Sequence, residues 1–334
     1  MIISNIFWRV IAWFATFGMF VYGAFSGFNG GDFIGLYEAN VKSVDYYCND
    51  FYDAVPQTEI FNIVSDHFFS PLADGKTVKK AIVIGYDGCR ADVLSQIDEE
   101  HPSAIKTLAE DSGSVLLSYC GGVNYPRINV QATSTAPGWC SMLTGVWATE
   151  HGVDENYSPK SEEYPTLLLS LVESGAAASS AFYVSWGGHF TENGATYINE
   201  KNYAESKGLP VTFRQAGDDN GTFANVMSDV ASPDCSDFIF SIFEYCDHYG
   251  HSNGFCIRNG FYTEGFFAAE KTGSDIIEAI KARPTYDTED WLIIITSDHG
   301  GYNVEHGGTT MQERYTFIAA NKDLTGYISS SPIC

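Results

Sequence analysis

Basic residues are scarce in this chain of 334 residues, which has 18 Lys and Arg against 42 Asp and Glu and a formal net charge of −24. A field of that sign repels polyanions at long range, which argues against a nucleic-acid polymer as a partner. The eight cysteines include no Cys-x-x-Cys pair, so a thioredoxin-type site or a zinc ribbon is not expected. The chain also lacks a repeat of fixed period, which excludes a solenoid or propeller.

Long apolar runs without a charge are equally rare, and there is only one of membrane-spanning length, at residues 10–28. Its nineteen residues come close to the ~20 that a helix needs to cross a membrane. Arg9 precedes it and Asp32 follows it, so the positive flank should stay inside and the rest of the chain should be exported. The segment is either a membrane anchor or a cleaved signal peptide, and both interpretations stay open. We therefore expect an extracytoplasmic protein that contacts the membrane through residues 10–28 if they are retained.

The remaining sequence is that of a globular α/β protein, with 45% hydrophobic and 18% charged residues. Apolar runs that predict strands covered on both faces occur at 81–88, 114–119, 180–186, 237–245, 291–300 and 316–320. Helical segments are expected between them at 102–110, 137–144, 164–173, 221–230 and 263–283. This alternation predicts a mainly parallel sheet with helices on both faces. We expect three regions: an anchor or signal at 1–28, a connector at 29–78 and a catalytic domain at 79–334.

Acidic and imidazole side chains gather where three of the predicted strands end. They are Asp87 after the first strand, Asp247 and His251 after the fourth, and Asp298, His299 and His306 after the fifth. An Asp at one strand end is most often a turn or cap residue, but three such clusters favour a shared site, because ligands bind at the carboxyl ends of parallel strands. Three Asp and three His exceed the needs of one tetrahedral zinc and suit two metal ions, with zinc favoured by the imidazoles.

A candidate nucleophile, Thr135, stands just before the helix expected at 137–144. Pro137 suits the first turn of that helix and Gly145 its end, which places Thr135 at or just before the N-cap. Ser and Thr cap many helices without any further function. However, the free amides and the positive end of the helix dipole would face a bound anion such as phosphate, and a nearby metal could hold the hydroxyl as an alkoxide.

These residues together resemble the type I phosphodiesterase/nucleotide pyrophosphatase family of the alkaline phosphatase superfamily. The resemblance runs from about Ala81 to Ala320. It rests on the motifs that contain Asp87-Gly88-Cys89-Arg90-Ala91-Asp92, Thr135-Ala136-Pro137, Glu150-His151-Gly152, Asp247-His248-Tyr249-Gly250-His251, Ser297-Asp298-His299-Gly300 and the later His306. The resemblance implies an alkaline-phosphatase-like three-layer fold.

The resemblance also implies a mechanism with two Zn²⁺ ions per chain. Thr135 would attack phosphorus in line and form a phospho-threonyl intermediate, which is then hydrolysed. The substrate would be a small phosphorylated molecule, a nucleotide or another phosphodiester. The metal ligands it implies are Asp247, His251 and His306 for one ion, and Asp87, Asp298, His299 and the Thr135 oxygen for the other.

Substrate contacts are less clear from the sequence. Within the resemblance, an Asn is expected three residues after the nucleophile, and Gly138 stands there, so a donor for a non-bridging oxygen is missing. Trp186 and Tyr157 could form an aromatic slot, but in a chain with 15% aromatic residues a core role is favoured. We expect His248 to be a bystander.

Other functions remain possible on the same scaffold. A phosphomonoesterase or phosphonate hydrolase would use the same two-metal centre but needs a cation near the phosphoryl group, and Arg127 is the only arginine near the nucleophile in sequence. A sulfatase is disfavoured because the β-methyl of Thr135 prevents oxidation to an aldehyde hydrate. A different class is a catalytically inactive surface protein that binds a partner, although such a protein would be expected to lose metal ligands that this chain keeps.

Overall fold

The computed structural model describes residues 54–110, 113–122, 131–258 and 260–327. The predicted anchor or signal at 10–28 and the residues Cys48, Arg127 and Cys334 lie outside the described residues. Within the described ranges, no helix combines the length and the apolar character needed to cross a membrane. The six cysteines of these ranges are buried and form no disulfide.

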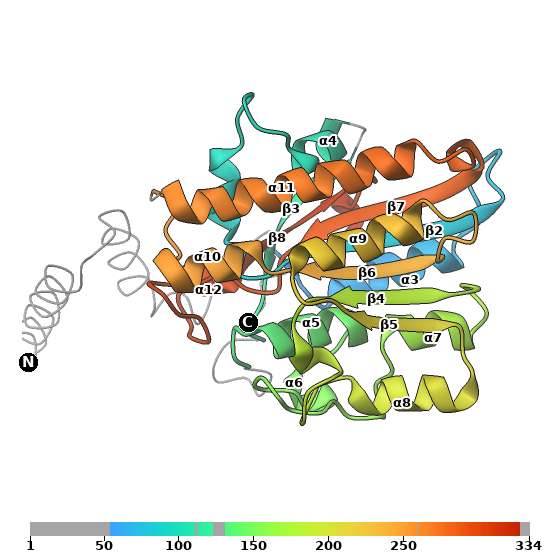
Figure 1. Cartoon of the computed structure of the whole chain (residues 1–334), viewed down its shortest axis with the longest axis horizontal. Helices are drawn as coiled ribbons and strands as arrows, with labels where there is room; N and C mark the ends of the chain where they lie inside the picture. Colours follow the sequence, from blue (N-terminus) through green and yellow to red (C-terminus); the bar gives the residue numbers. More distant parts are fainter. Residues whose placement is uncertain (1–53, 111–112, 123–130, 259, 328–334) are drawn as a thin grey trace, which may run out of the picture.

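One sheet of eight strands forms the centre of the molecule (Figure 1). Its strands lie in the spatial order β1-β3-β8-β7-β2-β6-β4-β5. Only β8 runs antiparallel to its neighbours β3 and β7, and the other pairs are parallel. The strands are β1 Val55–Pro56, β2 Val78–Tyr86, β3 Ser114–Tyr119, β4 Ser180–Val184, β5 Val211–Gln215, β6 Phe238–Phe243, β7 Glu289–Thr296 and β8 Tyr315–Ala320. The predicted mainly parallel α/β fold is confirmed.

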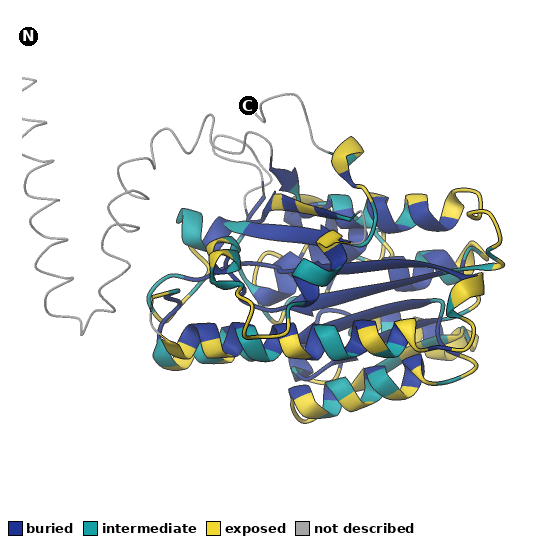
Figure 2. Ribbon diagram, turned by 90° about the horizontal axis from the view of Figure 1, so that it is seen from above, coloured by how far each residue is buried: buried dark blue, intermediate teal, exposed yellow. Residues whose placement is uncertain are grey.

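Helices cover both faces of this sheet and complete a three-layer fold. Alternate residues of β2 point to opposite sides: Ala81 and Val83 pack on the side of α3, α5 and α7, whereas Ile82 and Ile84 pack on the side of α4, α9 and α11. In Figure 2 the buried strands run between helices whose outer faces are exposed. The helices are α3 Glu59–Phe69, α4 Ala104–Glu110, α5 Thr135–Thr144, α6 Ala148–His151, α7 Leu167–Glu173, α8 Ile198–Lys207, α9 Asp219–Val230, α10 Tyr245–Asn253, α11 Gly260–Lys281 and α12 Met311–Arg314.

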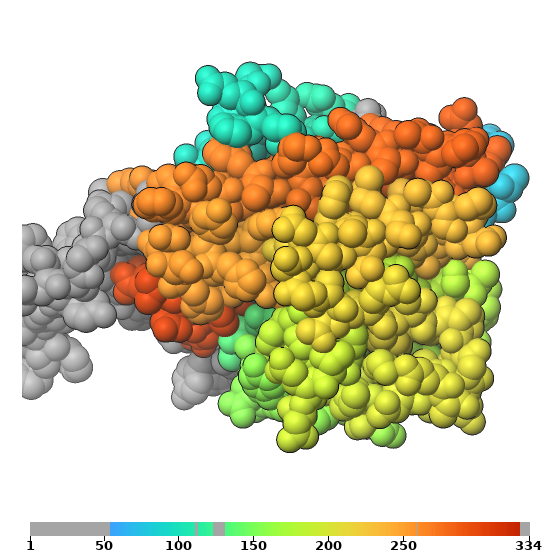
Figure 3. Space-filling view, in the orientation of Figure 1, coloured from blue at the N-terminus to red at the C-terminus, as the bar shows by residue number. Residues whose placement is uncertain are grey.

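The longest of these helices, α11, joins segments that are far apart in the sequence. It packs against α4, α9 and α10 and against the short helix Ala91–Gln96. Figure 3 shows α11 in orange beside the blue-green segment around residues 91–110. Because α10 follows β6 and the Ala91–Gln96 helix follows β2, α11 supports the chain just beyond the ends of two central strands.

The structure adds elements that the apolar pattern did not predict. All six predicted strands are present, but β1, β5 and the helices α6, α8, α10 and α12 were not expected. Residues 54–78 fall within the predicted connector at 29–78, yet β1 pairs with β3 and α3 buries Ile60 and Val64 in the core. The packed domain therefore begins before residue 79.

Candidate active site

The predicted metal ligands lie at one edge of the sheet, where three neighbouring strands end. Asp87 directly follows β2, and Asp298 and His299 follow β7, the neighbour of β2. Asp247 and His251 stand four residues apart on α10, which follows β6, the other neighbour of β2. Four residues are about one helical turn, so both side chains of α10 point to the same side. The central parallel strands thus bring ligands from three parts of the chain together.

His299 lies at the centre of this group. Its Nε2 atom is 3.5 Å from Asp87 Oδ1 and 3.3 Å from Asp298 Oδ2. Asp247 forms the second half of the group, with His251 Nε2 3.4 Å from Oδ2 and His306 Nε2 3.6 Å from Oδ1. Two overlapping sets of three residues therefore have ligand atoms within 4.8 Å of one another: Asp87, Asp298 and His299, and Asp247, His299 and His306.

Hydrogen bonds fix the protonation of the three imidazoles. Each Nδ1 lies within hydrogen-bond distance of a backbone carbonyl, so Nδ1 carries the hydrogen and Nε2 presents a lone pair. These contacts are His251 with Val304 O at 2.7 Å, His299 with Gly300 O at 2.7 Å and His306 with Thr133 O at 3.0 Å. The lone pairs therefore face carboxylate oxygens and repel them unless a cation or a proton lies between the two.

Three buried ligand atoms have no hydrogen-bond partner in the described part of the chain: His299 Nε2, Asp298 Oδ2 and Asp247 Oδ1. Buried polar atoms of this kind are rare in native proteins unless they bind a ligand or water. Their oxygen and nitrogen chemistry fits a divalent metal ion. The residues present thus fit the metal centre that the sequence predicts, while the ligand assignments themselves stay predictions.

The pKa shifts of the site also favour a bound cation. Burial, together with the nearby Asp298 and Asp247, raises the pKa of Asp87 well above its usual value. Burial also raises the pKa of Asp298 well above its usual value and that of Asp247 to about 6. Burial lowers the pKa of His299 well below its usual value. Bound dications would offset this clustered negative charge and favour the ionised carboxylates and neutral imidazoles.

Thr135 is the first residue of α5 and faces this centre. Its Oγ1 lies 3.4 Å from Asp87 Oδ1, and the side chain is largely buried. Ser134 is the N-cap, with extended backbone and no capping side-chain hydrogen bond. The expectation that Thr135 lies at or before the N-cap is therefore wrong by one residue. All seven predicted site residues nevertheless come together.

Asn156 brings a side-chain amide to the cavity beside Thr135. Its Oδ1 accepts a hydrogen bond of 2.9 Å from the backbone N–H of Ala136, and the residue lines the same cavity as Thr135. This contact leaves the two Nδ2 hydrogens for other partners. Gly138, where an Asn was expected, has no room for a side chain: a Cβ there would lie 2.8 Å from Asp298 Cβ. Spacing along α5 could not reveal this amide, because Asn156 lies in a loop beyond α6.

Five of the seven predicted site residues line a cavity of about 250 Å³: Asp87, Thr135, Asp247, His251 and His306. Four more residues line it: Tyr157, Trp186, Glu244 and His248. Tyr157 is 51% exposed, so the core role favoured for it is wrong, whereas Trp186 is half-buried and packs against the core while it also lines the cavity. His248 Nε2 lies 3.1 Å from Glu244 Oε2, and the expectation that His248 is a bystander stays a prediction. Burial alone would raise the pKa of Glu244, but the hydrogen bond with His248 and other polar contacts hold it below its usual value. No periodicity in the sequence marks these loop and helix-start positions.

Two other motif residues have structural roles beside the site. The Nε2 of His151 lies 3.0 Å from Ser141 Oγ, and its Nδ1 accepts a hydrogen bond from the Val153 N–H, so His151 supports α5 from below. Arg90 is buried and pairs with the Asp92 carboxylate at 2.6 Å, away from the cavity. Neither residue lines the cavity, so both support the site from outside it.

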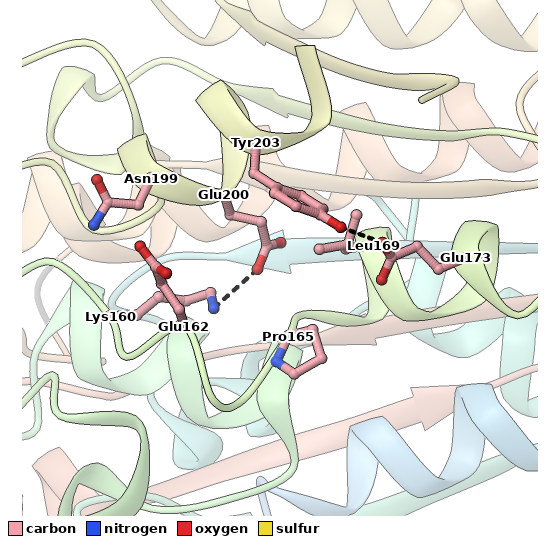
Figure 4. Close-up of a pocket in the computed structure, with 8 residues that line it drawn as sticks. All are labelled: Lys160, Glu162, Pro165, Leu169, Glu173, Asn199, Glu200 and Tyr203. Carbon is pink, nitrogen blue, oxygen red and sulfur yellow. Dashed lines mark hydrogen bonds and ion pairs between the residues drawn. The ribbon is translucent and has the colours of Figure 1, made fainter. Parts of the chain in front are cut away.

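A second cavity, of about 330 Å³, lies beside α8 and is lined by Lys160, Glu162, Glu173, Glu200 and Tyr203 among others (Figure 4). Its buried charges already have partners. Lys160 Nζ pairs with Glu200 Oε2 at 2.9 Å and donates to the carbonyls of Ser161 and Tyr164. The Lys160–Glu200 pair therefore fixes the chain before α7 to α8, and the cavity shows no unsatisfied group for a ligand.

A family comparison agrees with the architecture of the site. The model of the type I phosphodiesterase/nucleotide pyrophosphatase family matches residues 81–317. This chain belongs to that family. The match includes all seven predicted site residues, so the resemblance seen in the motifs is confirmed at the level of the family. No curated protein sequence matches the chain significantly.

Solved structures of the alkaline phosphatase superfamily show a similar fold at low sequence identity. A putative sulfatase from Bacteroides thetaiotaomicron is 12% identical with a TM-score of 0.50, over 74% of this chain and 65% of that protein. Murine ectonucleotide pyrophosphatase/phosphodiesterase 5, an inactive variant in complex with AMP, is 18% identical with a TM-score of 0.46, over 66% and 57%. The phosphonate monoester hydrolase of Agrobacterium radiobacter is 13% identical with a TM-score of 0.48, over 73% and 68%. The chain thus spans less than two thirds of the length of the sulfatase and of the murine protein.

Proposed function

We propose that this protein hydrolyses phosphodiesters through Thr135 and a pair of zinc ions. Its family consists of phosphate-ester hydrolases in a metal-dependent superfamily. The observation that carries the proposal is the convergence of three carboxylates and three imidazole lone pairs beside the Thr135 hydroxyl. Two dications would balance that charge. The imidazoles favour zinc over magnesium or calcium.

The ligands divide between two neighbouring positions. His299 is within reach of both groups, which supports two ions that lie close together. When bound, the ions would supply Lewis acidity toward the phosphoryl oxygens and lower the pKa of the Thr135 hydroxyl. We assign Asp247, His251 and His306 to one ion, and Asp87, Asp298, His299 and Thr135 Oγ1 to the other.

The side chains and backbone of this protein would carry the remaining steps. Thr135 Oγ1 gives up its proton to solvent and attacks phosphorus, so that an O–P bond forms while the P–O bond to the leaving alcohol breaks. Water then cleaves the phospho-threonine, which restores the hydroxyl and releases a phosphomonoester. The Nδ2 group of Asn156 and the backbone N–H of Thr135 are the nearby donors for the non-bridging oxygens, because the Ala136 N–H already donates to Asn156 Oδ1 and Pro137 has no N–H.

The lining of the cavity favours a diester over a monoester. A monoester dianion brings one more negative charge than a diester. Among the described residues that line the cavity, none is Lys or Arg, whereas Glu244 adds a further carboxylate. Repulsion from that carboxylate would weaken monoester binding. A phosphomonoesterase or phosphonate hydrolase is therefore the second candidate.

Two measurements on zinc-reconstituted protein test the proposal. The first compares kcat/KM on bis(4-nitrophenyl) phosphate and 4-nitrophenyl phosphate, and the diester should be preferred. A preference for the monoester by orders of magnitude would end the diesterase proposal. The second is the zinc content, expected near two per chain. Less than one zinc per chain, without hydrolysis of either ester, would favour the inactive binding protein.

A further inference from the structure

Two buried cysteines meet next to the candidate metal centre. Cys89 lies just beyond the end of β2, and Cys246 is the second residue of α10, directly before Asp247. Both belong to the core on the α11 side of the sheet, and both are fully buried. Their thiols are reduced in this structure and are in hydrogen-bond contact with each other. The pair therefore connects two segments that are far apart in the sequence.

The backbones of the two segments are in direct contact at this point. A Cβ on Gly88 would lie 2.9 Å from the Cα of Asp247, so a glycine is needed for the turn after β2 to approach α10 this closely. Gly88 also has a φ of +67°, which other residues rarely adopt. Gly88 directly precedes Cys89, and Asp247 directly follows Cys246. The two backbones thus approach more closely than the ~7 Å between α-carbons that a disulfide can span.

Hydrogen bonds fix the chain on both sides of Cys89. The hydroxyl of Tyr262, on α11, donates to the Gly88 carbonyl at 2.7 Å and accepts from the Arg90 N–H at 3.0 Å. The Cys89 N–H itself donates to Ser297 Oγ at 3.0 Å. These contacts leave the backbone of Cys89 little freedom, so its side chain stays directed toward Cys246.

We propose that Cys89 and Cys246 become joined by a disulfide that links the end of β2 to α10. A buried cysteine alone serves as a small hydrophobic residue, but two thiols in contact can be joined with little movement of the backbone. The bond holds Asp87 and Asp247, which belong to different sets of candidate ligands, at a fixed separation. This inference goes beyond the proposed function and does not depend on it.

The oxidant is another disulfide, such as oxidised glutathione. One cysteine thiolate attacks it and forms a mixed disulfide, and the second cysteine then displaces the remaining thiol. One S–S bond forms in the protein, and the oxidant leaves as two thiols that take up the two protons. Because both cysteines are buried in the folded chain, this exchange takes place during folding. It requires an oxidising compartment, which the export predicted from residues 10–28 would provide.

Peptide mapping of the full chain tests for the bond directly. The protein is expressed through a secretory pathway, alkylated in denaturant without reductant and digested with trypsin. Trypsin releases Cys89 in residues 81–90 and Cys246 in residues 215–258. Mass spectrometry should find these two peptides linked, and they should separate after reduction. Recovery of residues 81–90 as an alkylated, unlinked peptide would overturn the proposal.

Variants identify the partner, because residues 215–258 also contain Cys235 and Cys256. Cys246→Ser should abolish the link. Cys235→Ser is the matched control, since Cys235 is also buried but lies before β6, and it should keep the link. A link that survives Cys246→Ser would overturn the pairing.

Thermal unfolding provides a second measurement, because a disulfide that closes so long a loop should stabilise the fold. A phosphine reductant should lower the Tm of the wild type and of Cys235→Ser by roughly 5–15 °C. It should leave the Tm of the double variant Cys89→Ala/Cys246→Ala unchanged. A wild-type Tm that does not respond to the reductant would overturn the stabilising role of the bond. Neither measurement needs activity, so a linked protein that hydrolyses no phosphate ester would uphold the disulfide and end only the proposed function.

Discussion

Gly138 allows α5 to approach the metal centre closely, and its replacement by Ala should damage catalysis more than stability. A Cβ at this position would lie 2.8 Å from Asp298 Cβ and 2.9 Å from the Asp298 carbonyl oxygen. Carbon atoms prefer separations of about 3.5–4.0 Å, so the helix or the strand end must move by several tenths of an ångström. That movement separates Thr135 at the start of α5 from the ligand Asp298.

The size of the effect follows from overpacking and misplacement. An extra methyl group in a packed core costs about 1–3 kcal/mol of unfolding free energy. In a domain of this size, that lowers Tm by roughly 2–10 °C. A nucleophile displaced by about 1 Å loses on the order of 100-fold in rate. We therefore expect Gly138→Ala to fold but to have about 1% of the wild-type kcat.

The assay combines thermal unfolding, zinc content and kcat on a nitrophenyl diester. Gly217→Ala is the matched control, because Gly217 is exposed, has no positive φ and would place its Cβ more than 4 Å from any neighbour. The control should keep the wild-type Tm and kcat. Wild-type kcat in Gly138→Ala would refute the argument that α5 needs this close approach.

Three further variants test other parts of the structure. Thr135→Ala should abolish turnover but keep most of the bound zinc, because six protein ligands remain, and a tenth of the wild-type rate would mean that another group attacks. Lys160→Met should lower the unfolding free energy in urea by about 3–5 kcal/mol because it leaves Glu200 buried without its partner, and a change below about 1 kcal/mol would contradict this. Burial raises the pKa of Glu270 to about 7. The protonated side chain therefore stabilises the fold fully below the unfolded-state pKa of ~4.5, and this stabilisation is lost as the pH rises through 7. Between pH 5 and pH 8, the unfolding free energy of Glu270→Gln should therefore rise relative to that of the wild type by on the order of 2 kcal/mol. The same difference between variant and wild type at both pH values would refute the raised pKa of Glu270.

The convergence of the candidate metal ligands could be predicted because their positions follow from strand order. Asp87, Asp247 and Asp298 each stand within a few residues of an apolar run, and parallel strands end at a common edge. Because these strands are buried on both faces, they occur in the sequence as continuous apolar runs. β5 escaped prediction because it lies at the edge of the sheet, where its side chains are only partly buried.

The substrate side of the site could not be predicted in the same way. Asn156 and Tyr157 lie in a loop, Trp186 follows a strand, and Glu244 caps α10, so no single periodicity connects them. Their position depends on contacts across the fold, such as Asn156 with Ala136 and Trp186 with Gly188. The donor expected near Gly138 illustrates the difference. Spacing along a helix predicts which side chains share a face, but only the packed structure shows that this face touches Asp298 and that a loop brings the amide of Asn156 to the cavity.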